Sequence, residues 1–236
     1  MPLRLFFALL VLASIGTAQT ADELVARNLS ARGGADRLRA IQTMTMTGTI
    51  GFGGPANPLR VKVRRPNQIR EDFVLDGAAI VRAYDGARGW ESKAGQSRQL
   101  VAGELDNIRE EAENAIEGPL LDYAKKGSRA EAIGKADFNG KPAYKLRITT
   151  SMGTTITQFL DATSYLEVHE EIERSVNGKP MLIVEDISDY RDVSGIKFAH
   201  RFVSGSRENP AAATLQIDKM ELNAPLDAAV FGTPSK

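Results

Sequence analysis

The stretch TMTMTGTIGF, residues 43–52, alternates polar and apolar side chains almost without interruption. Because successive side chains of a strand point to opposite faces, the alternation places Met44, Met46, Ile50 and Phe52 on one face and the threonines on the other. This pattern is typical of a half-buried antiparallel strand. It predicts a sheet with one apolar face, and the same pattern recurs through most of the chain.

Further apolar runs follow, and turn residues separate them. Asp76-Gly77 and Asp85-Gly86 stand between alternating segments, where Asp-Gly is a strong hairpin signal. We expect further strands over residues 59–65, 68–75, 79–84, 88–93, 130–138, 143–149, 154–160, 165–175, 181–190, 196–204 and 213–222. With the opening strand they amount to about 11–12 strands, which is typical of an all-β sandwich or barrel.

Two regions have helical spacing instead. A helix is expected with Asp22 as its N-cap, with a bend at Gly33-Gly34 before a second short piece. Residues 104–126 carry another apolar stripe, and a separate helix is expected after Pro119, ending at Gly127. The sequence therefore predicts a mainly β (α+β) chain with an N-terminal helix and a central helical lid.

The N-terminus reads as a secretory signal peptide. A short basic start is followed by an apolar run over residues 5–15 and by small residues, Gly16 and Ala18, at the −3 and −1 positions. The run is shorter than the about 20 residues that a spanning helix needs. We expect a signal peptide over residues 1–18, cleaved after Ala18, and one domain over residues 19–236.

Composition narrows the class of protein further. The chain has no cysteine, so it has neither a disulfide framework nor a cysteine to acylate after the signal. Its 30 basic and 30 acidic residues cancel, and this balance argues against a nucleic-acid partner. We expect a monomer outside the cytoplasm, without a lipid anchor.

Catalytic and metal-binding patterns are weak. No G-x-S-x-G motif accompanies the two histidines, His169 and His200. His169, Glu171 and Glu173 share one face of an expected strand, but the opposite face is apolar, so we interpret the charged face as solvated. We predict no catalytic residue, no metal and no cofactor. Glu185 and His200 are the ionisable residues expected on apolar faces.

Three motifs appear in order along the chain: ARGGA at 31–35 ahead of Leu38, DGARGW at 85–90, and DYRDVSGIKF at 189–198. Together they resemble LolA/LolB-like proteins, in particular the divergent branch of outer-membrane lipoprotein-sorting-like proteins. The resemblance extends to Phe231, although Ala199 stands where related sequences often have proline. It implies an unclosed, strongly curved antiparallel β half-barrel with helices over its concave apolar side. It also implies a periplasmic carrier or binding protein whose cavity accepts acyl chains.

A lipid or lipoprotein acyl chain would enter such a cavity noncovalently, gaining about 0.8 kcal/mol per buried methylene. Methionine suits this role because its side chain is flexible and polarizable. The candidate cavity and lid residues are Met44, Met46, Ile50, Phe52, Leu59, Val61, Val63, Phe73, Leu75, Trp90, Leu105, Ile108, Leu120 and Leu121. We expect Leu24, Leu29 and Leu38 to pack the N-terminal helices across the mouth. The same residues could instead form ordinary core beneath the helices.

Two other functions stay open at this point. An interaction module of the same shape could sense the state of the cell envelope by binding a membrane-protein partner. An enzyme acting on a lipid or polysaccharide is the second alternative, and it requires a polar cluster inside the cavity.

Overall fold

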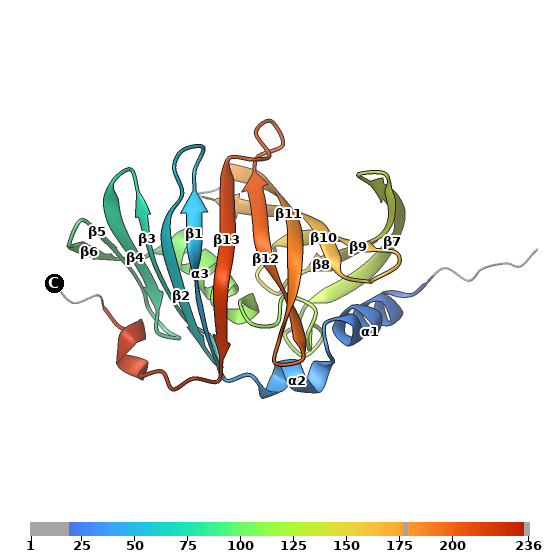
Figure 1. The fold of residues 1–236 in the computed structure, drawn as a ribbon, viewed down its shortest axis with the longest axis horizontal. Coiled ribbons are helices and arrows are strands. Elements are labelled where there is room, and N and C mark those ends of the chain that lie inside the picture. The colour runs from blue at the N-terminus through green and yellow to red at the C-terminus, as the bar shows by residue number, and fades with distance from the viewer. Residues whose placement is uncertain (1–18, 177–178, 234–236) are drawn as a thin grey trace, which may run out of the picture.

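The computed structural model describes residues 19–176 and 179–233, which form one curved antiparallel sheet with three helices packed against its inner side and its edge (Figure 1). The strands of this part of the chain follow the order β6-β5-β4-β3-β2-β1-β13-β12-β11-β10-β9-β8-β7. The edge strands β6 and β7 do not pair with each other in the described ranges, so the sheet is unclosed. No helix in these ranges is long and apolar enough to cross a bilayer.

Two meanders make up the sheet. The first comprises β1 (Thr43–Gly51), β2 (Asn57–Arg64), β3 (Gln68–Leu75), β4 (Ala78–Tyr84), β5 (Gly89–Lys93) and β6 (Gln96–Gln99). The second comprises β7 (Arg129–Phe138), β8 (Lys141–Thr149), β9 (Thr155–Asp161), β10 (Glu167–Val176), β11 (Lys179–Val193), β12 (Ile196–Gly205) and β13 (Ala213–Leu222). Pairing of β1 with β13 joins the two meanders.

The sheet has one strand more than the sequence predicted. Strand β6 was missed because Gln96–Gln99 is polar and exposed throughout, so it has no alternation to detect. It forms because Ala94 and Gly95 both have positive φ angles, 49° and 82°, which close a tight hairpin back onto β5. The other strands were predicted to within a few residues at each end.

The N-terminal helices α1 (Ala21–Ala31) and α2 (Ala35–Ala40) are separated by the predicted glycine bend. Thr20, rather than Asp22, is the N-cap: its Oγ1 accepts from the Glu23 amide, and the Glu23 carboxylate accepts from the Thr20 amide. Gly33 has a φ of 117°, and a Cβ there would lie 2.3 Å from the Gly195 carbonyl oxygen. The bend therefore brings α1 and α2 directly against the β11–β12 turn.

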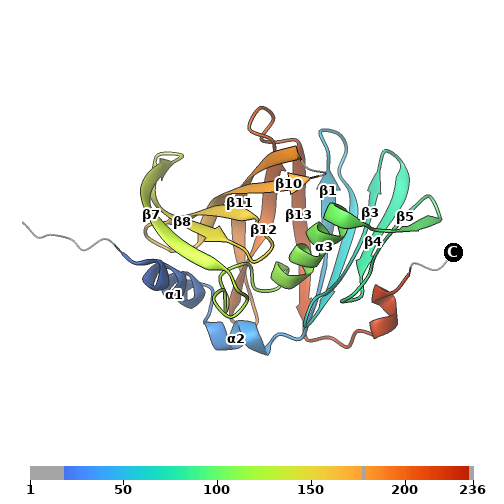
Figure 2. The ribbon, with the colours of Figure 1, turned by 180° about the vertical axis from the view of Figure 1, so that it is seen from behind.

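Helix α3 (Ala102–Asn114) lies on the inner side of the sheet, as Figure 2 shows. The prediction of a second lid helix after Pro119 is wrong. Residues 115–127 form a series of turns instead, which we call the strap. Gly118 and Asp122 have positive φ angles, 75° and 53°, which an α-helix does not allow. Arg39 holds Asp122 in place through two hydrogen bonds of 2.9 Å, so tertiary contacts override the local helical preference.

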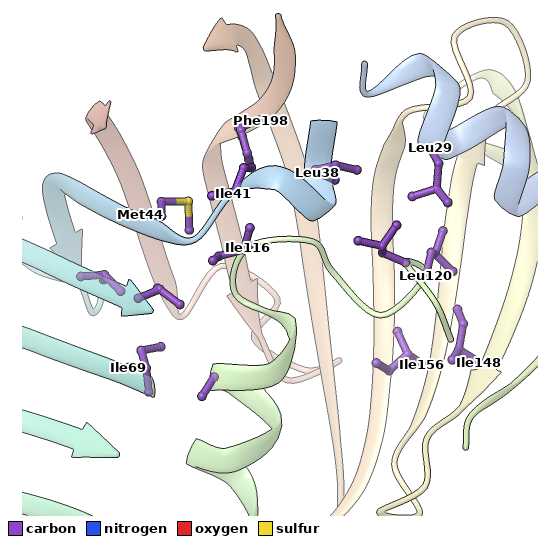
Figure 3. Packing of buried hydrophobic residues seen from close by; sticks show 14 of the residues in the cluster. Leu29, Leu38, Ile41, Met44, Ile69, Ile116, Leu120, Ile148, Ile156 and Phe198 are labelled. Atoms are coloured by element: carbon purple, nitrogen blue, oxygen red, sulfur yellow. The ribbon is translucent and has the colours of Figure 1, made fainter. Parts of the chain in front are cut away.

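The core lies where the strap and the N-terminal helices meet the sheet (Figure 3). Leu29 and Leu120 pack toward Ile148 and Ile156 on β8 and β9. A second part of the same cluster brings Met44, Ile41, Ile116 and Phe198 together. Both parts bury side chains of the concave face, while much of the convex face stays in solvent.

Gly48, within the opening stretch, has no room for a side chain. Its Cβ would lie 1.9 Å from the backbone carbonyl oxygen of Gln216, where a β-bulge interrupts the β1–β13 register. Gly48→Ala is therefore expected to lower the free energy of unfolding by about 2–3 kcal/mol, measured by urea denaturation. Gly54→Ala is the matched control, because nothing lies within 4 Å of that Cβ, and it should cost less than about 0.5 kcal/mol. Equal effects of the two substitutions would show that the bulge tolerates a methyl group.

Candidate functional site

A cavity of ≈ 500 Å³ lies between the concave face of the sheet, α3 and the strap. Strands β1, β2 and β13 contribute only apolar side chains to it. The larger apolar side chains that line the cavity, from these strands and from neighbouring elements, are Met44, Met46, Val61, Ile69, Ile116, Leu120, Ile156, Ile172, Ile187, Phe198, Phe202, Leu215 and Met220. One wall of the cavity is thus suited to hydrocarbon.

A second wall, formed by β9, β10 and β11, is polar. Gln158, Glu167, Glu170, Arg174 and Glu185 all line the cavity there. The sequence led us to expect few ionisable groups on this side, and that expectation is wrong. The alternation rule assigned β10 an apolar inner face, whereas the structure turns two of its glutamates inward.

Glu170 has the same parity as the inward-facing Ile172, so alternation alone places it in the cavity, whereas a β-bulge explains the position of Glu167. The β9–β10 register shifts between Glu167 and His169, so the residue between them has no partner. Glu167 opposite Leu160 therefore faces the same side as Glu170 opposite Gln158, although the two glutamates are three residues apart. A strict period of two cannot place both on one face.

Strand β11 has a similar irregularity. Asp189 has a φ of 56°, and on either side of it Ile187 and Tyr190 both line the cavity. The Asp189 side chain is exposed and accepts from Arg191. Tyr190 thereby joins the polar wall, and no simple alternation would have predicted it.

Enclosure changes the acidity of the polar wall. Desolvation, aided by the neighbouring Glu170 and Asp186, raises the pKa of Glu185 to about 8. Desolvation also raises the pKa of Glu167 well above its usual range, where the nearby Glu170 acts in the same direction. The pKa of Glu170 is raised by desolvation as well. At neutral pH, Glu185 is therefore mostly protonated, and Glu167 and Glu170 hold their protons more tightly than exposed glutamates do.

A different group of charges lies under α3. Arg82 is 3.0 Å from Glu71 and 3.3 Å from Glu111, so it bridges the two carboxylates. Desolvation and the proximity of Glu111 raise the pKa of Glu71 to about 7, against the opposing effect of Arg82. Because these two cavity-lining glutamates share a cation, they are partly neutralised.

Ionic contacts tie the strap over the cavity. Glu117 is only 4% exposed, and its carboxylate contacts Arg65 and lies 2.7 Å from the Lys126 ammonium group. Arg32, at the end of α1, donates to the carbonyl oxygens of Glu117 and Ile116 at 2.5 Å and 3.5 Å. These contacts hold the strap against α1 and the end of β2.

The predicted cavity residues divide into two sets. Met44, Met46, Val61 and Leu120 line the cavity. The rest do not line it: Leu59, Val63, Ile108 and Leu121 are buried core, Ile50, Phe73 and Leu105 pack against that core, and Leu75 and Trp90 are half-buried. Phe52 is 45% exposed, because β1 ends one residue before it.

The expected mouth residues Leu24, Leu29 and Leu38 are all buried in the core cluster and do not line the cavity. From α1, the lining residue Asn28 and the adjoining Arg32 were not anticipated. Both are polar residues in a segment whose sequence signal is the apolar spacing of its leucines.

The two histidines lie outside the cavity lining. His169 faces the convex side, where its ring stacks on Phe138 at 4.7 Å and its Nδ1 lies 2.6 Å from Asp186. His200 is buried, with Nδ1 2.9 Å from the Phe198 carbonyl oxygen. Within residues 19–176 and 179–233, no three His, Asp or Glu side chains come close enough to hold a metal ion.

This geometry defines a half-barrel with an internal cavity. Solved structures share the fold. The chain has a divergent LolA-like fold. A LolA superfamily protein from Nitrosomonas europaea aligns over 91% of this chain and 98% of its own, with a TM-score of 0.59 and 11% identity. A DUF1329 family protein from Desulfovibrio piger aligns over 90% and 97%, also with a TM-score of 0.59 and 11% identity.

A third structure is a domain assigned to the outer membrane lipoprotein-sorting proteins of Vibrio parahaemolyticus. It covers 88% of this chain and 97% of its own at a TM-score of 0.54 and 11% identity. No protein-family model matches the sequence, and no curated protein matches it significantly. At such low identity, the likeness establishes the fold.

The raised pKa values predict how stability changes with pH. Because the folded protein holds protons on Glu185, Glu167 and Glu170 more tightly than the unfolded chain does, its free energy of unfolding should fall as pH rises. The fall begins near the unfolded glutamate pKa of about 4.3 and, for Glu185, ends above its folded pKa of about 8.

Glu185→Gln removes one of these protons, so its denaturation midpoint should depend less steeply on pH across that window than the wild-type midpoint. Glu173→Gln, on the exposed side of β10, should leave the wild-type slope unchanged. A Glu185→Gln slope equal to that of the wild type would show that Glu185 ionises normally.

Proposed function

We propose that this chain is a periplasmic carrier or binding protein that holds the acyl chain of a lipid or lipoprotein noncovalently beneath α3 and the strap. The observation that carries the proposal is the ≈ 500 Å³ cavity, with its continuous apolar wall from β1, β2 and β13. Pockets of about 300–1,000 Å³ with apolar walls and a few polar groups are the usual form of a small-molecule site.

The energetics support a hydrocarbon ligand. Each methylene that leaves water contributes about 0.8 kcal/mol, so a chain of about a dozen carbons contributes roughly 10 kcal/mol. Association costs of about 4–15 kcal/mol offset much of this gain, and the result is reversible binding suited to a carrier. Met44, Met46 and Met220 face the ligand, where flexible thioethers adapt to chains of different shape.

The cellular setting follows from the N-terminus. The signal-like segment over residues 1–18 lies outside the described residues, and we propose that it directs export before removal. The Vibrio domain with this fold is assigned to lipoprotein sorting, and transport of a lipidated cargo across the envelope suits the same architecture. We propose that binding and release involve no covalent chemistry.

Filling the cavity should abolish ligand binding. Met46→Trp places a large side chain against the apolar wall, so the affinity for a fluorescent fatty acid should fall at least about tenfold in a fluorescence titration. Phe52→Trp is the control: it introduces the same side chain at an exposed position outside the cavity and should bind as the wild type does.

Native mass spectrometry of the wild type, exported from a diderm host, identifies what the protein carries. A copurified lipid that is absent from Met46→Trp supports carriage. An empty cavity in repeated mild preparations, together with a stable membrane-protein partner, would instead support the envelope-sensing alternative. Equal fatty-acid affinity of both tryptophan variants would rule out the cavity as the binding site.

A further inference from the structure

Two glutamates of the polar wall stand directly opposite each other on neighbouring strands. Glu170 on β10 pairs in register with Glu185 on β11, and on its other side it pairs with Gln158 on β9. All three side chains line the cavity. Two carboxyl groups directly opposite each other repel when ionised, so the pair gives the sheet no electrostatic stabilisation.

These carboxyl groups have no cationic partner in the described part of the chain. Neither Glu167, Glu170 nor Glu185 makes an ion pair there. Arg32, which lies nearby, is engaged with the carbonyl oxygens of the strap. The polar end of the cavity therefore holds an excess of unneutralised carboxyl groups.

Hydrogen-bond acceptors at this end are also left without donors. Gln158 is only 2% exposed, and its Oε1 has no partner among the described residues. The Oε1 atom of Glu167 is likewise buried and has no hydrogen-bond partner among the described residues. A buried acceptor without a donor costs about 1–3 kcal/mol, which a ligand donor can recover.

The acid-base state of the wall favours a cation over an anion. In the empty cavity the raised pKa values of Glu167, Glu170 and Glu185 reflect the cost of ionising them there. A positive group among them would remove that cost and release a proton. An anionic group would meet three carboxyl groups, and three cations also line the cavity: Arg32, Lys197 and Arg174, whose buried Nε has no acceptor among the described residues. Arg32 is engaged with the strap and Lys197 lies on β12, so Arg174 is the one lining cation on β9, β10 and β11.

We propose that the polar end of the cavity, formed by Gln158, Glu170 and Glu185 with Glu167 beside them, binds the protonated amine of an amphipathic ligand. The hydrocarbon part of that ligand lies against the methionines of the apolar wall. This inference rests on the proposed function, because it assumes that the cavity takes an alkyl chain. It adds that the ligand carries a cationic nitrogen at its polar end.

Three single-chain probes of equal length test the proposal by calorimetry on the mature protein near pH 7: dodecylamine, dodecanol and dodecanoate, each below its micelle concentration. Dodecylamine should bind at least about tenfold more tightly than dodecanoate. In the double variant Glu170→Gln/Glu185→Gln, this preference should shrink to less than about threefold. Glu173→Gln, on the other face of β10, should keep it.

The number of protons released when a probe binds is an independent test of the amine site. Titrations of the wild type in two buffers of different ionisation enthalpy should show proton release when dodecylamine binds and none when dodecanol binds. The double variant should release less, and its thermal unfolding checks that it is folded. If it does not fold, the comparison of the three probes on the wild type still decides.

The outcomes separate the two proposals. Tighter or equal binding of dodecanoate or dodecanol would overturn the amine site while leaving the acyl-chain carrier intact. An unchanged dodecylamine preference in the folded double variant would overturn it as well. Failure of all three probes to bind would contradict the carrier function itself, and the amine site with it.

Discussion

The pairing of β1 with β13 is the contact on which the rest of the structure depends. Among the described strands it is the one neighbouring pair that is not consecutive in the chain, and it joins the first strand to the last. Each meander can form from local hairpins, but the two form one continuous concave face only when β1 pairs with β13, a junction that we call the seam. Gly48 lets the seam close, because the bulge at that point brings the Gln216 carbonyl oxygen to where a side chain would stand.

The seam also organises the chemistry of the cavity. The strands beside it, β1, β2 and β13, line the cavity with apolar side chains alone, whereas β9, β10 and β11 bring in the carboxyl groups. A single curved sheet thus presents hydrocarbon and hydrogen-bonding surfaces to the same enclosed volume. Enclosure makes the second surface unusual, because the desolvation that favours an alkyl chain is also what raises the pKa of Glu185.

Most of the architecture was predictable, because alternation and Asp-Gly turns are local signals and the strands largely obey them. Met44, Met46 and Val61 were correctly placed on the inner face of the sheet for this reason. Glu185 was correctly expected on an apolar face, and Glu170 has the parity of the inward Ile172. Glu167 and Tyr190 were not predictable, since the bulge after Glu167 and the positive φ of Asp189 shift the side-chain parity without any sequence signal. The strap was missed for a different reason: Arg39 and Glu117 fix it through contacts with distant segments, which override its helical spacing.

The strap has a consequence for how such proteins diverge. It bounds the cavity with residues such as Ile116 and Leu120, but it is fastened by side-chain ion pairs to Arg39 and Arg65 rather than by strand pairing. Its length can therefore change without altering the register of any strand. About a dozen residues outside the sheet thus form one boundary of the cavity, so insertion or deletion at this single place can change the enclosed volume while every strand pairing stays as it is.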